Sequence, residues 1–343
     1  MKKIFLAFVL ITLISFNTCE DNPVNGDDTK PGRRDYIWEI DTIYTPFSML
    51  RDIWGHATDD VWTIAGGGDN DKKIFHFDGN TWINDPNAVP YQPLSIFGFS
   101  STNVWIGGGD GKIWHYDGTG WSEFTTLNVV PGKGISFGDI WGERVSDVYA
   151  VGAYTDGNSL FNNGVIAHFT NNKWSILHSY NDSGNIVRLY KSNNSQYPLV
   201  YVWHFNYYGD STFIYRLNQG ALQEFLSGSF GYNSHLFMNL IGDQIFILKG
   251  QEIFEYENDR LKFLLKVDLP EFEQGFFGRT RRDIFLYMDN GIAHYNGTNI
   301  EYIYNSDSDI VFGGGIVFDR EIFIISTGLG QGGRNFILRG KLN

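Results

Sequence analysis

The sequence predicts an all-β fold assembled from repeated four-stranded units, and three observations support this prediction. One phrase recurs along the 343-residue chain with the same spacing between its aromatic residues. The segments that follow each copy are short and rich in β-branched and aromatic residues, with glycine or polar residues at their ends. Beyond residue 35 no stretch shows an apolar repeat of period 3.6, which an amphipathic helix would need. Such self-similarity is the signature of a repeat architecture.

The repeated phrase has a fixed internal register. Its copies are DIWGHATDDVW at 52–62, SIFGFSSTNVW at 95–105, DIWGERVSDVY at 139–149 and GFFGRTRRDIF at 275–285. Each is followed by a second block, in turn IFHFDGNTW, IWHYDGTGW, IAHFTNNKW and IAHYNGTNI. The distance between the two blocks varies from copy to copy. Connections of fixed length indicate tight turns in a packed sheet, and those of variable length indicate exposed loops.

Each unit is predicted to contain four strands, which we name a to d in chain order. Asp78-Gly79, Asp117-Gly118 and Asn296-Gly297 lie between strands c and d. They match the two-residue hairpin turn in which both central residues have positive φ.

Weaker copies fill the rest of the chain, from Ile186 to Leu226, from Leu236 to Leu265 and from Val311 to the end. The last copy has only three strands, and residues 36–44 resemble its missing strand d. We therefore predict a seven-bladed β-propeller of four-stranded blades, closed by the pairing of residues 36–44 with Phe336–Gly340. An open solenoid would not need its first strand to complete its last unit, and a β-sandwich would not show a phase-locked repeat.

The N-terminal region predicts an exported, membrane-attached protein. Lys2 and Lys3 precede an apolar run from Ile4 to Phe16, which is typical of a signal peptide over residues 1–18. Cys19, the single cysteine, follows this run. Its position resembles that of the lipid-modified cysteine of bacterial lipoproteins, although ordinary cleavage that leaves Cys19 incidental is the alternative.

Residues 19–35 are polar and predict a lipid-anchored flexible tether ahead of a propeller over 36–343. Glu20 and Asp21 resemble the acidic export signal of surface lipoproteins in Bacteroidetes-like bacteria. The expected location is thus the outer membrane of a bacterial envelope, on its surface or periplasmic face. The protein would contact the membrane only through this lipid.

Composition limits the partners. The net charge of −13 argues against nucleic acid, because such a surface repels phosphate backbones. Arg279, Arg281 and Arg282 form either a local basic patch or a solvated turn, and we favour the solvated turn. We expect a monomer with a protein or carbohydrate ligand.

The repeated polar residues predict structural roles. The histidines His76, His115, His168 and His294 occupy one strand position in four units, and a catalytic base repeated four times makes little sense. We expect them to form hydrogen bonds that bridge neighbouring blades. Asp60, Asn103 and Asp147 are expected to cap the a–b turn, and the repeated tryptophans to fill the core.

No motif predicts a cofactor or a catalytic group. GLGQGG at 328–333 matches GxGxxG spacing, but no helix is predicted after it. The chain has no paired cysteines for zinc. The loops at 66–71 and 107–111 could offer oxygen ligands to calcium, but ordinary glycine-rich b–c turns are the favoured interpretation.

The candidate ligand surface is the face that carries the b–c and d–a loops. Its candidate binding residues are the aromatics Tyr91, Tyr154, Phe161, Tyr207 and Tyr208. Exposed rings beside Asn, Asp and Gly suit recognition of a protein or a carbohydrate. The alternative is that these rings fold back onto the blade edges.

The repeat resembles bacterial propeller repeats with the consensus D-x-W-G…D-V-W-x-V-G…I-x-H-Y-D-G-x-x-W, found in secreted and lipoprotein-anchored proteins. More distantly, it resembles the propellers of sialidase-type and photosystem-assembly proteins. This group has no single function. We expect a non-catalytic binding or scaffold protein. The alternative is a propeller glycosidase or lyase acting on an extracellular polysaccharide, with carboxylates such as Asp52 and Asp139 over the channel.

Overall fold

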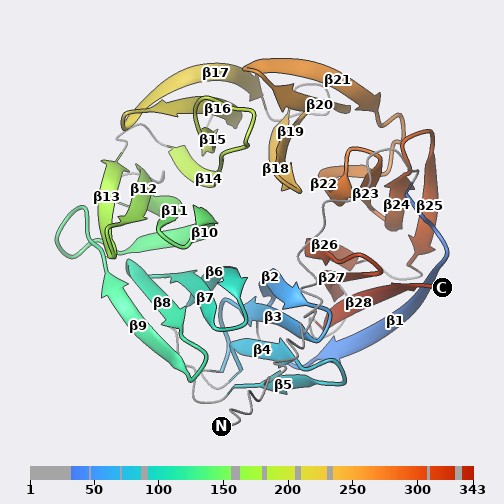
Figure 1. Ribbon diagram of the computed structural model, residues 1–343, viewed down its shortest axis with the longest axis horizontal. Helices are drawn as coiled ribbons and strands as arrows, with labels where there is room; N and C mark the ends of the chain where they lie inside the picture. Colours follow the sequence, from blue (N-terminus) through green and yellow to red (C-terminus); the bar gives the residue numbers. More distant parts are fainter. Residues whose placement is uncertain are drawn as a thin grey trace, which may run out of the picture.

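Seven four-stranded antiparallel sheets form a closed ring in the computed structural model (Figure 1). The structure describes residues 32–45, 48–69, 72–85, 92–155, 163–179, 184–204, 210–229, 235–306, 310–328 and 334–343. The first strand of each sheet lines the ring centre, and the last lies on the outer rim. The predicted seven-bladed β-propeller is confirmed.

The strands of the first four blades follow the sequence repeat. Blade 1 comprises β2 (Leu50–Ala57), β3 (Asp60–Ala65), β4 (Ile74–Phe77) and β5 (Trp82–Asn84). Blade 2 comprises β6 (Pro93–Ser100), β7 (Asn103–Gly108), β8 (Lys112–Tyr116) and β9 (Trp121–Thr126). Blade 3 comprises β10 (Ile135–Arg144), β11 (Asp147–Tyr154), β12 (Asn163–Thr170) and β13 (Lys173–Ser179). Blade 4 comprises β14 (Gly184–Tyr190), β15 (Leu199–His204), β16 (Ser211–Asn218) and β17 (Ala221–Ser229).

The other blades complete the ring. Blade 5 comprises β18 (Leu236–Ile241), β19 (Gln244–Lys249), β20 (Glu252–Glu257) and β21 (Arg260–Lys266). Blade 6 comprises β22 (Phe272–Thr280), β23 (Asp283–Met288), β24 (Gly291–Tyr295) and β25 (Ile300–Asn305). Blade 7 comprises β26 (Ile310–Val317), β27 (Glu321–Gly328), β28 (Asn335–Leu342) and, as its outer strand, β1 (Tyr36–Ile43).

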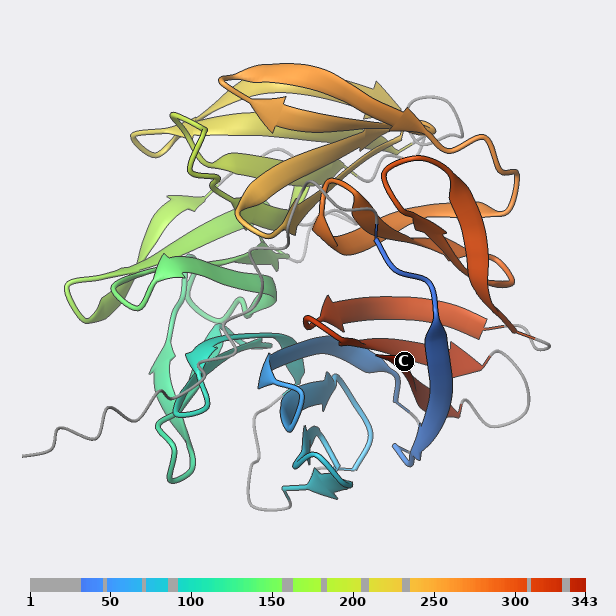
Figure 2. The same ribbon diagram turned by 45° about the vertical axis from the view of Figure 1, so that its right-hand side comes forward.

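The two ends of the chain share blade 7, as predicted. The register of β1 and β28 runs antiparallel from Tyr36 opposite Leu342 to Ile43 opposite Asn335. Figures 1 and 2 both show β1 along the outer edge of this blade. The buried Asn335 side chain also donates to the Ser48 carbonyl (2.8 Å) and accepts from the Leu50 N–H (3.3 Å). It thereby fixes the connection between β1 and β2.

Arg279 joins this closing strand to blade 6. Its guanidinium donates to Asp283 Oδ2 (2.7 Å), to the Tyr36 hydroxyl (2.9 Å) and to the Phe318 carbonyl. The side chain is 5% exposed, so the prediction of a solvated turn is wrong for this residue. A buried guanidinium requires such partners, because its charge is costly to remove from water.

The repeated histidines bond within their own blades rather than across neighbours, contrary to the prediction. His76 Nε2 lies 2.7 Å from Asp60 Oδ1, and the same pairing joins His168 to Asp147. His115 pairs with Asn103, and His294 with Asp283. Each pair joins strand c to the start of strand b. These Asp and Asn side chains therefore hold a neighbouring strand, whereas capping of the a–b turn was expected.

The predicted two-residue c–d turns are also wrong in detail. Gly79, Gly118 and Gly297 have positive φ, but the residues before them do not. In the first of these turns, the Asp78 carboxylate accepts the N–H groups of Asn80 and Thr81 and so closes a longer loop. Among the c–d turns, two successive residues with positive φ occur instead at Asn171-Asn172, Gln219-Gly220 and Asn258-Asp259.

Glycine in the repeated phrase allows blades to approach closely. A Cβ atom on Gly98 would lie 2.7 Å from the Trp54 ring of blade 1. One on Gly142 would lie 2.7 Å from Phe99 of blade 2. Any side chain at these positions would push the neighbouring blade away.

The described end of the predicted tether contacts the propeller. Arg34 donates to the carbonyls of His294 and Asn299 and forms an ion pair with Glu301 (2.8 Å). The signal peptide and Cys19 lie outside the described residues. Within the described part of the chain, no helix has the length and apolar character needed to span a membrane.

Replacing Arg279 with alanine is expected to lower the free energy of unfolding by about 3–5 kcal/mol, because Asp283 would keep a buried charge without its guanidinium partner. Arg281→Ala, in the same turn but 38% exposed, should change it by less than about 0.5 kcal/mol. Urea unfolding of both variants provides the test. Equal losses would contradict a special role for Arg279 in ring closure.

Candidate functional site

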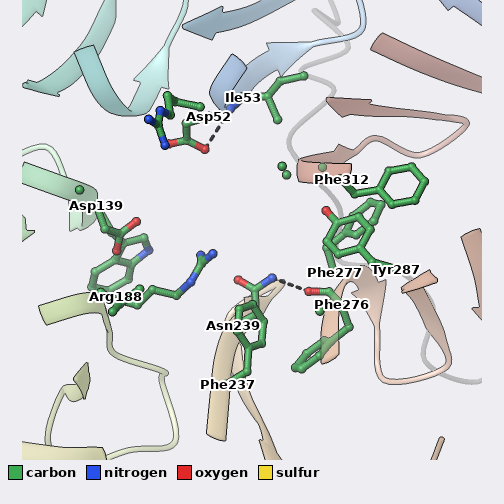
Figure 3. A pocket seen from close by; sticks show the side chains of 18 of the residues that line it. Asp52, Ile53, Asp139, Arg188, Phe237, Asn239, Phe276, Phe277, Tyr287 and Phe312 are labelled. Carbon is green, nitrogen blue, oxygen red and sulfur yellow. Dashed lines mark hydrogen bonds between the residues drawn. The ribbon is translucent and has the colours of Figure 1, made fainter. Parts of the chain in front are cut away.

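A cavity of about 460 Å³ lies on the axis of the ring, and residues from the inner strands of all seven blades line it (Figure 3). The lining residues come mainly from the first half of each inner strand, such as Arg51–Trp54 of β2 and Glu273–Phe277 of β22. The inner strands begin where the d–a connections end. The cavity is therefore nearest the face that carries the d–a and b–c connections.

One position of the inner strand recurs around the cavity. It directly follows a β-bulge, and we call it the bulge position. The bulge positions are Asp52, Ser95, Asp139, Arg188 and Gly314, from blades 1, 2, 3, 4 and 7. A bulge re-aims the side chain that follows it, and such features are common beside functional sites. Four of these residues line the cavity, namely two acids, one base and one glycine, whereas Ser95 is fully buried and does not line it.

The side chains at these positions also join neighbouring blades. Asp52 Oδ2 accepts the Ile96 N–H of blade 2 (2.9 Å), while its Oδ1 accepts the Ile53 N–H. The Leu189 N–H of blade 4 bonds the Asp139 carboxylate. Ser95 makes the corresponding link to blade 3 by donating to the Phe137 carbonyl (3.0 Å).

Blade 5 uses an amide for the same purpose. Asn239 donates to the Phe276 carbonyl of blade 6 (2.8 Å), and its Oδ1 accepts the Leu240 N–H. Because Ser95 and Asn239 form such links without a charge, an acid is not required to join blades.

The two acids have strongly shifted titration. Burial raises the pKa of Asp52 to about 7, with a further increase from the nearby Asp139 charge, against the lowering effect of Arg188 and two backbone N–H groups. Burial raises the pKa of Asp139 to about 6, against the lowering effect of Arg188 and the Leu189 N–H. Perturbed carboxyl groups in a cavity mark candidate functional sites.

Arg188 is the cation nearest these acids, and Figure 3 shows it extending into the cavity. Burial opposes its charge, but Tyr190, Asp139 and Asp52 outweigh burial and raise its pKa. Its Nη1 donates to the Tyr190 hydroxyl (2.8 Å), and its guanidinium lies over the Phe237 ring, 5.2 Å from the ring centroid. Arg188 therefore stays charged and rests on blade 5 through a cation–π contact.

The opposite side of the cavity is aromatic. The Tyr287 ring stacks between Phe277 (centroids 5.3 Å apart) and Phe312 (5.5 Å). Gly275 leaves room for it, because a Cβ atom there would lie 2.6 Å from the tyrosine ring. Burial raises the pKa of Tyr287, so its hydroxyl stays protonated and can donate a hydrogen bond.

The aromatic residues predicted to bind a ligand are not confirmed. Tyr154 is 5% exposed and packs with Ile135 and Phe137 in the core of blade 3, so its assignment to an exposed binding surface is wrong. Tyr91, Phe161, Tyr207 and Tyr208 lie outside the described residues. Among the described residues, no group of three or more His, Cys, Asp or Glu side chains is placed to hold a metal ion.

The sequence offered Asp52 and Asp139 as candidates, although their recurrence in the DIWG phrase indicated a structural role, and it missed Arg188. The irregular fourth copy could have indicated Arg188, because the RLY of its IVRLY segment corresponds to the DIW of the repeated phrase. Aligning this copy would have placed an arginine where blades 1 and 3 have aspartate.

The comparisons place the fold among known propellers. YCF48 bound to D1 peptide is similar, with a TM-score of 0.59 and 16% identity over 92% of this chain and 100% of that one. An inactive virginiamycin B lyase from Staphylococcus aureus with quinupristin has a TM-score of 0.61 and 12% identity, covering 88% and 99%. The WD40 propeller domain of Doa1 has a TM-score of 0.55 and 12% identity, covering 88% and 96%. At these identities the likeness shows the fold alone.

No family model and no curated protein matches the chain.

The shifted pKa of Asp52 predicts a pH-dependent effect on stability. The folded-state pKa of about 7 exceeds the ordinary value of 3.8, so ionisation of Asp52 destabilises the folded state as pH rises toward and through 7. Relative to wild type, Asp52→Asn should gain about 2–3 kcal/mol in unfolding free energy between pH 5 and pH 8, because about two pH units of this interval lie below the folded-state pKa. Denaturant titrations at both pH values measure this.

Ser95→Ala is the matched control, because it breaks an inter-blade bond at the same strand position without removing a charge. Its effect on unfolding should be the same at both pH values. A similar pH profile for the two variants would show that the Asp52 charge is not the cause.

Proposed function

We propose that this chain is a non-catalytic binding protein that holds a segment of a protein partner at the central cavity. The supporting observation is the cavity itself, where seven structurally equivalent strands present different side chains on one axis. A propeller that acted only as a scaffold would not need a charged arginine, two acids and a stacked tyrosine at its central cavity. YCF48, similar in fold, is described as bound to a peptide.

An enzyme acting on a polysaccharide is the second candidate, and the raised pKa values of Asp52 and Asp139 favour it. One acid that is protonated near neutral pH beside another that is ionised is the arrangement of an acid–base pair. Against this, both Asp52 oxygens already accept backbone N–H groups, one of them from blade 2. A carboxyl group engaged in this way is poorly placed to transfer protons to a substrate, so we favour binding.

We expect the protein partner to be retained through the loop face. The full chain, tagged and used as bait on an envelope extract, should capture a partner that is lost in the double variant Tyr207→Ser/Tyr208→Ser. Phe263→Ser removes an aromatic ring that is 55% exposed on the outer strand β21, so it should retain the partner. Direct binding of the purified partner confirms the interaction. Equal capture by all three proteins would rule out the loop-face contact, and binding to a glycan array without any protein partner would count against the proposal itself.

We further propose that a lipid on Cys19 attaches the chain to the outer membrane. Cys19→Ala should shift the protein from the membrane fraction to the soluble fraction and abolish incorporation of labelled fatty acid. Fractionation with and without detergent measures both effects. An unchanged membrane fraction would show that Cys19 does not anchor the protein.

A further inference from the structure

Arg188 has hydrogen-bonding capacity that the fold does not use. A guanidinium carries five N–H donors, and its hydrogen bond to the Tyr190 hydroxyl engages only Nη1. Its Nε is buried without a hydrogen-bond partner. Among the described residues, no carboxylate lies within the 4.0 Å of an ion pair with it. A buried, charged and incompletely bonded arginine is suited to an external anion, most strongly to a carboxylate that it can bind through two parallel bonds.

A second donor faces the same space. Figure 3 shows Arg188 and Tyr287 extending into the cavity from opposite sides, with Asn239 between them. No described residue bonds the Tyr287 hydroxyl, and Asn239 uses one of its two amide hydrogens on the Phe276 carbonyl. Arg188 and Tyr287 can therefore donate to one group placed between them.

The surroundings of these donors are apolar on the side away from the acids. Phe277 and Phe312 flank Tyr287, and Phe237 lies beneath Arg188. An apolar amino-acid side chain fits this wall. Sugar rings also stack on aromatic side chains, so a sugar acid is the competing ligand in the test below.

The deep end of the cavity favours the end of a chain over a continuous strand. On five inner strands, the lining residue furthest from the loop face is aromatic, namely Trp54, Phe97, Trp141, Tyr190 and Phe277. These bulky rings narrow the deep end of the cavity, so a peptide that ends there fits better than one that continues. The cavity volume of about 460 Å³ is in the range of small-ligand sites.

We propose that the cavity binds the C-terminal carboxylate of a peptide with an apolar last residue, with Arg188 and Tyr287 donating hydrogen bonds to that carboxylate. This inference rests on the proposed function, because it takes the partner to be a protein. Asp52 and Asp139 attract the Arg188 guanidinium, but each ionised acid also repels the bound carboxylate.

The test uses acetylated tetrapeptides that vary at the last residue, each made as the free acid and as the C-terminal amide. With the purified full chain, free acids ending in an apolar residue should bind at least about tenfold more tightly than their amides. Arg188→Gln should lose at least about tenfold, and Arg188→Lys should lose part of this because it keeps the charge but not the paired donors. Asp52→Asn should strengthen binding. Arg144→Gln, 67% exposed on the a–b turn of blade 3, is the matched control and should bind as wild type.

Tyr287→Phe is a second test variant that should fold as wild type does, because it removes only the hydroxyl and keeps the stacked ring. It should weaken binding of the free acids severalfold while circular dichroism stays unchanged. Equal binding of acids and amides, or wild-type binding by both folded variants, overturns the inference. Binding of oligogalacturonates in place of peptides overturns the assignment to a peptide.

The two proposals fail separately. If the chain captures a protein partner but shows no preference for free C-terminal acids, only this inference fails. If it captures no protein partner, the proposed function fails regardless of the tetrapeptide result.

Discussion

The pairing of β1 with β28 is the constraint on which the rest of the structure depends. Seven blades can surround an axial cavity only if the ring is closed, and eight register pairs between the two chain ends close it. Side chains extend this closure beyond blade 7. Trp38 donates to the Ile303 carbonyl of blade 6 (2.9 Å), and Arg279 reaches the Tyr36 hydroxyl from the same blade. Burial makes these bonds significant, because a missing partner would leave a polar group without water.

Closure then determines what the inner strands can display. At three of the bulge positions, Asp52, Asp139 and Arg188, the side chain both lines the cavity and contacts the next blade. Asp52 reaches Ile96, and Arg188 rests on Phe237. A substitution at such a position changes the blade contact and the chemistry of the cavity at once. The cavity is thus part of the fold.

The blades were predictable because aromatic spacing directly reports strand register. Trp54 opposite Trp62 and Phe97 opposite Trp105 are cross-strand pairs, and the seven residues between the members of each pair leave room for only one tight turn. Burial was less predictable. Tyr154 ends a strand and looks exposed in sequence, but Ile135 and Phe137 of the neighbouring strand cover it. The histidine partners and Arg188 were missed because both depend on which strands lie side by side, and in blade 4 the irregular a–b connection from Tyr190 to Leu199 obscures the repeat.

The acids at the ring centre are more than the fold requires. Ser95 and Asn239 link neighbouring blades through neutral side chains, whereas Asp52 makes its link with a carboxyl group whose ionisation near neutral pH destabilises the folded state. A neutral residue would avoid this cost. What the acids add is electrostatic, since Asp139 and Asp52 reinforce Tyr190 in raising the pKa of Arg188 against the effect of burial. Together with Tyr190, the two carboxyl groups therefore offset part of the cost of burying a charged arginine in the centre of the ring.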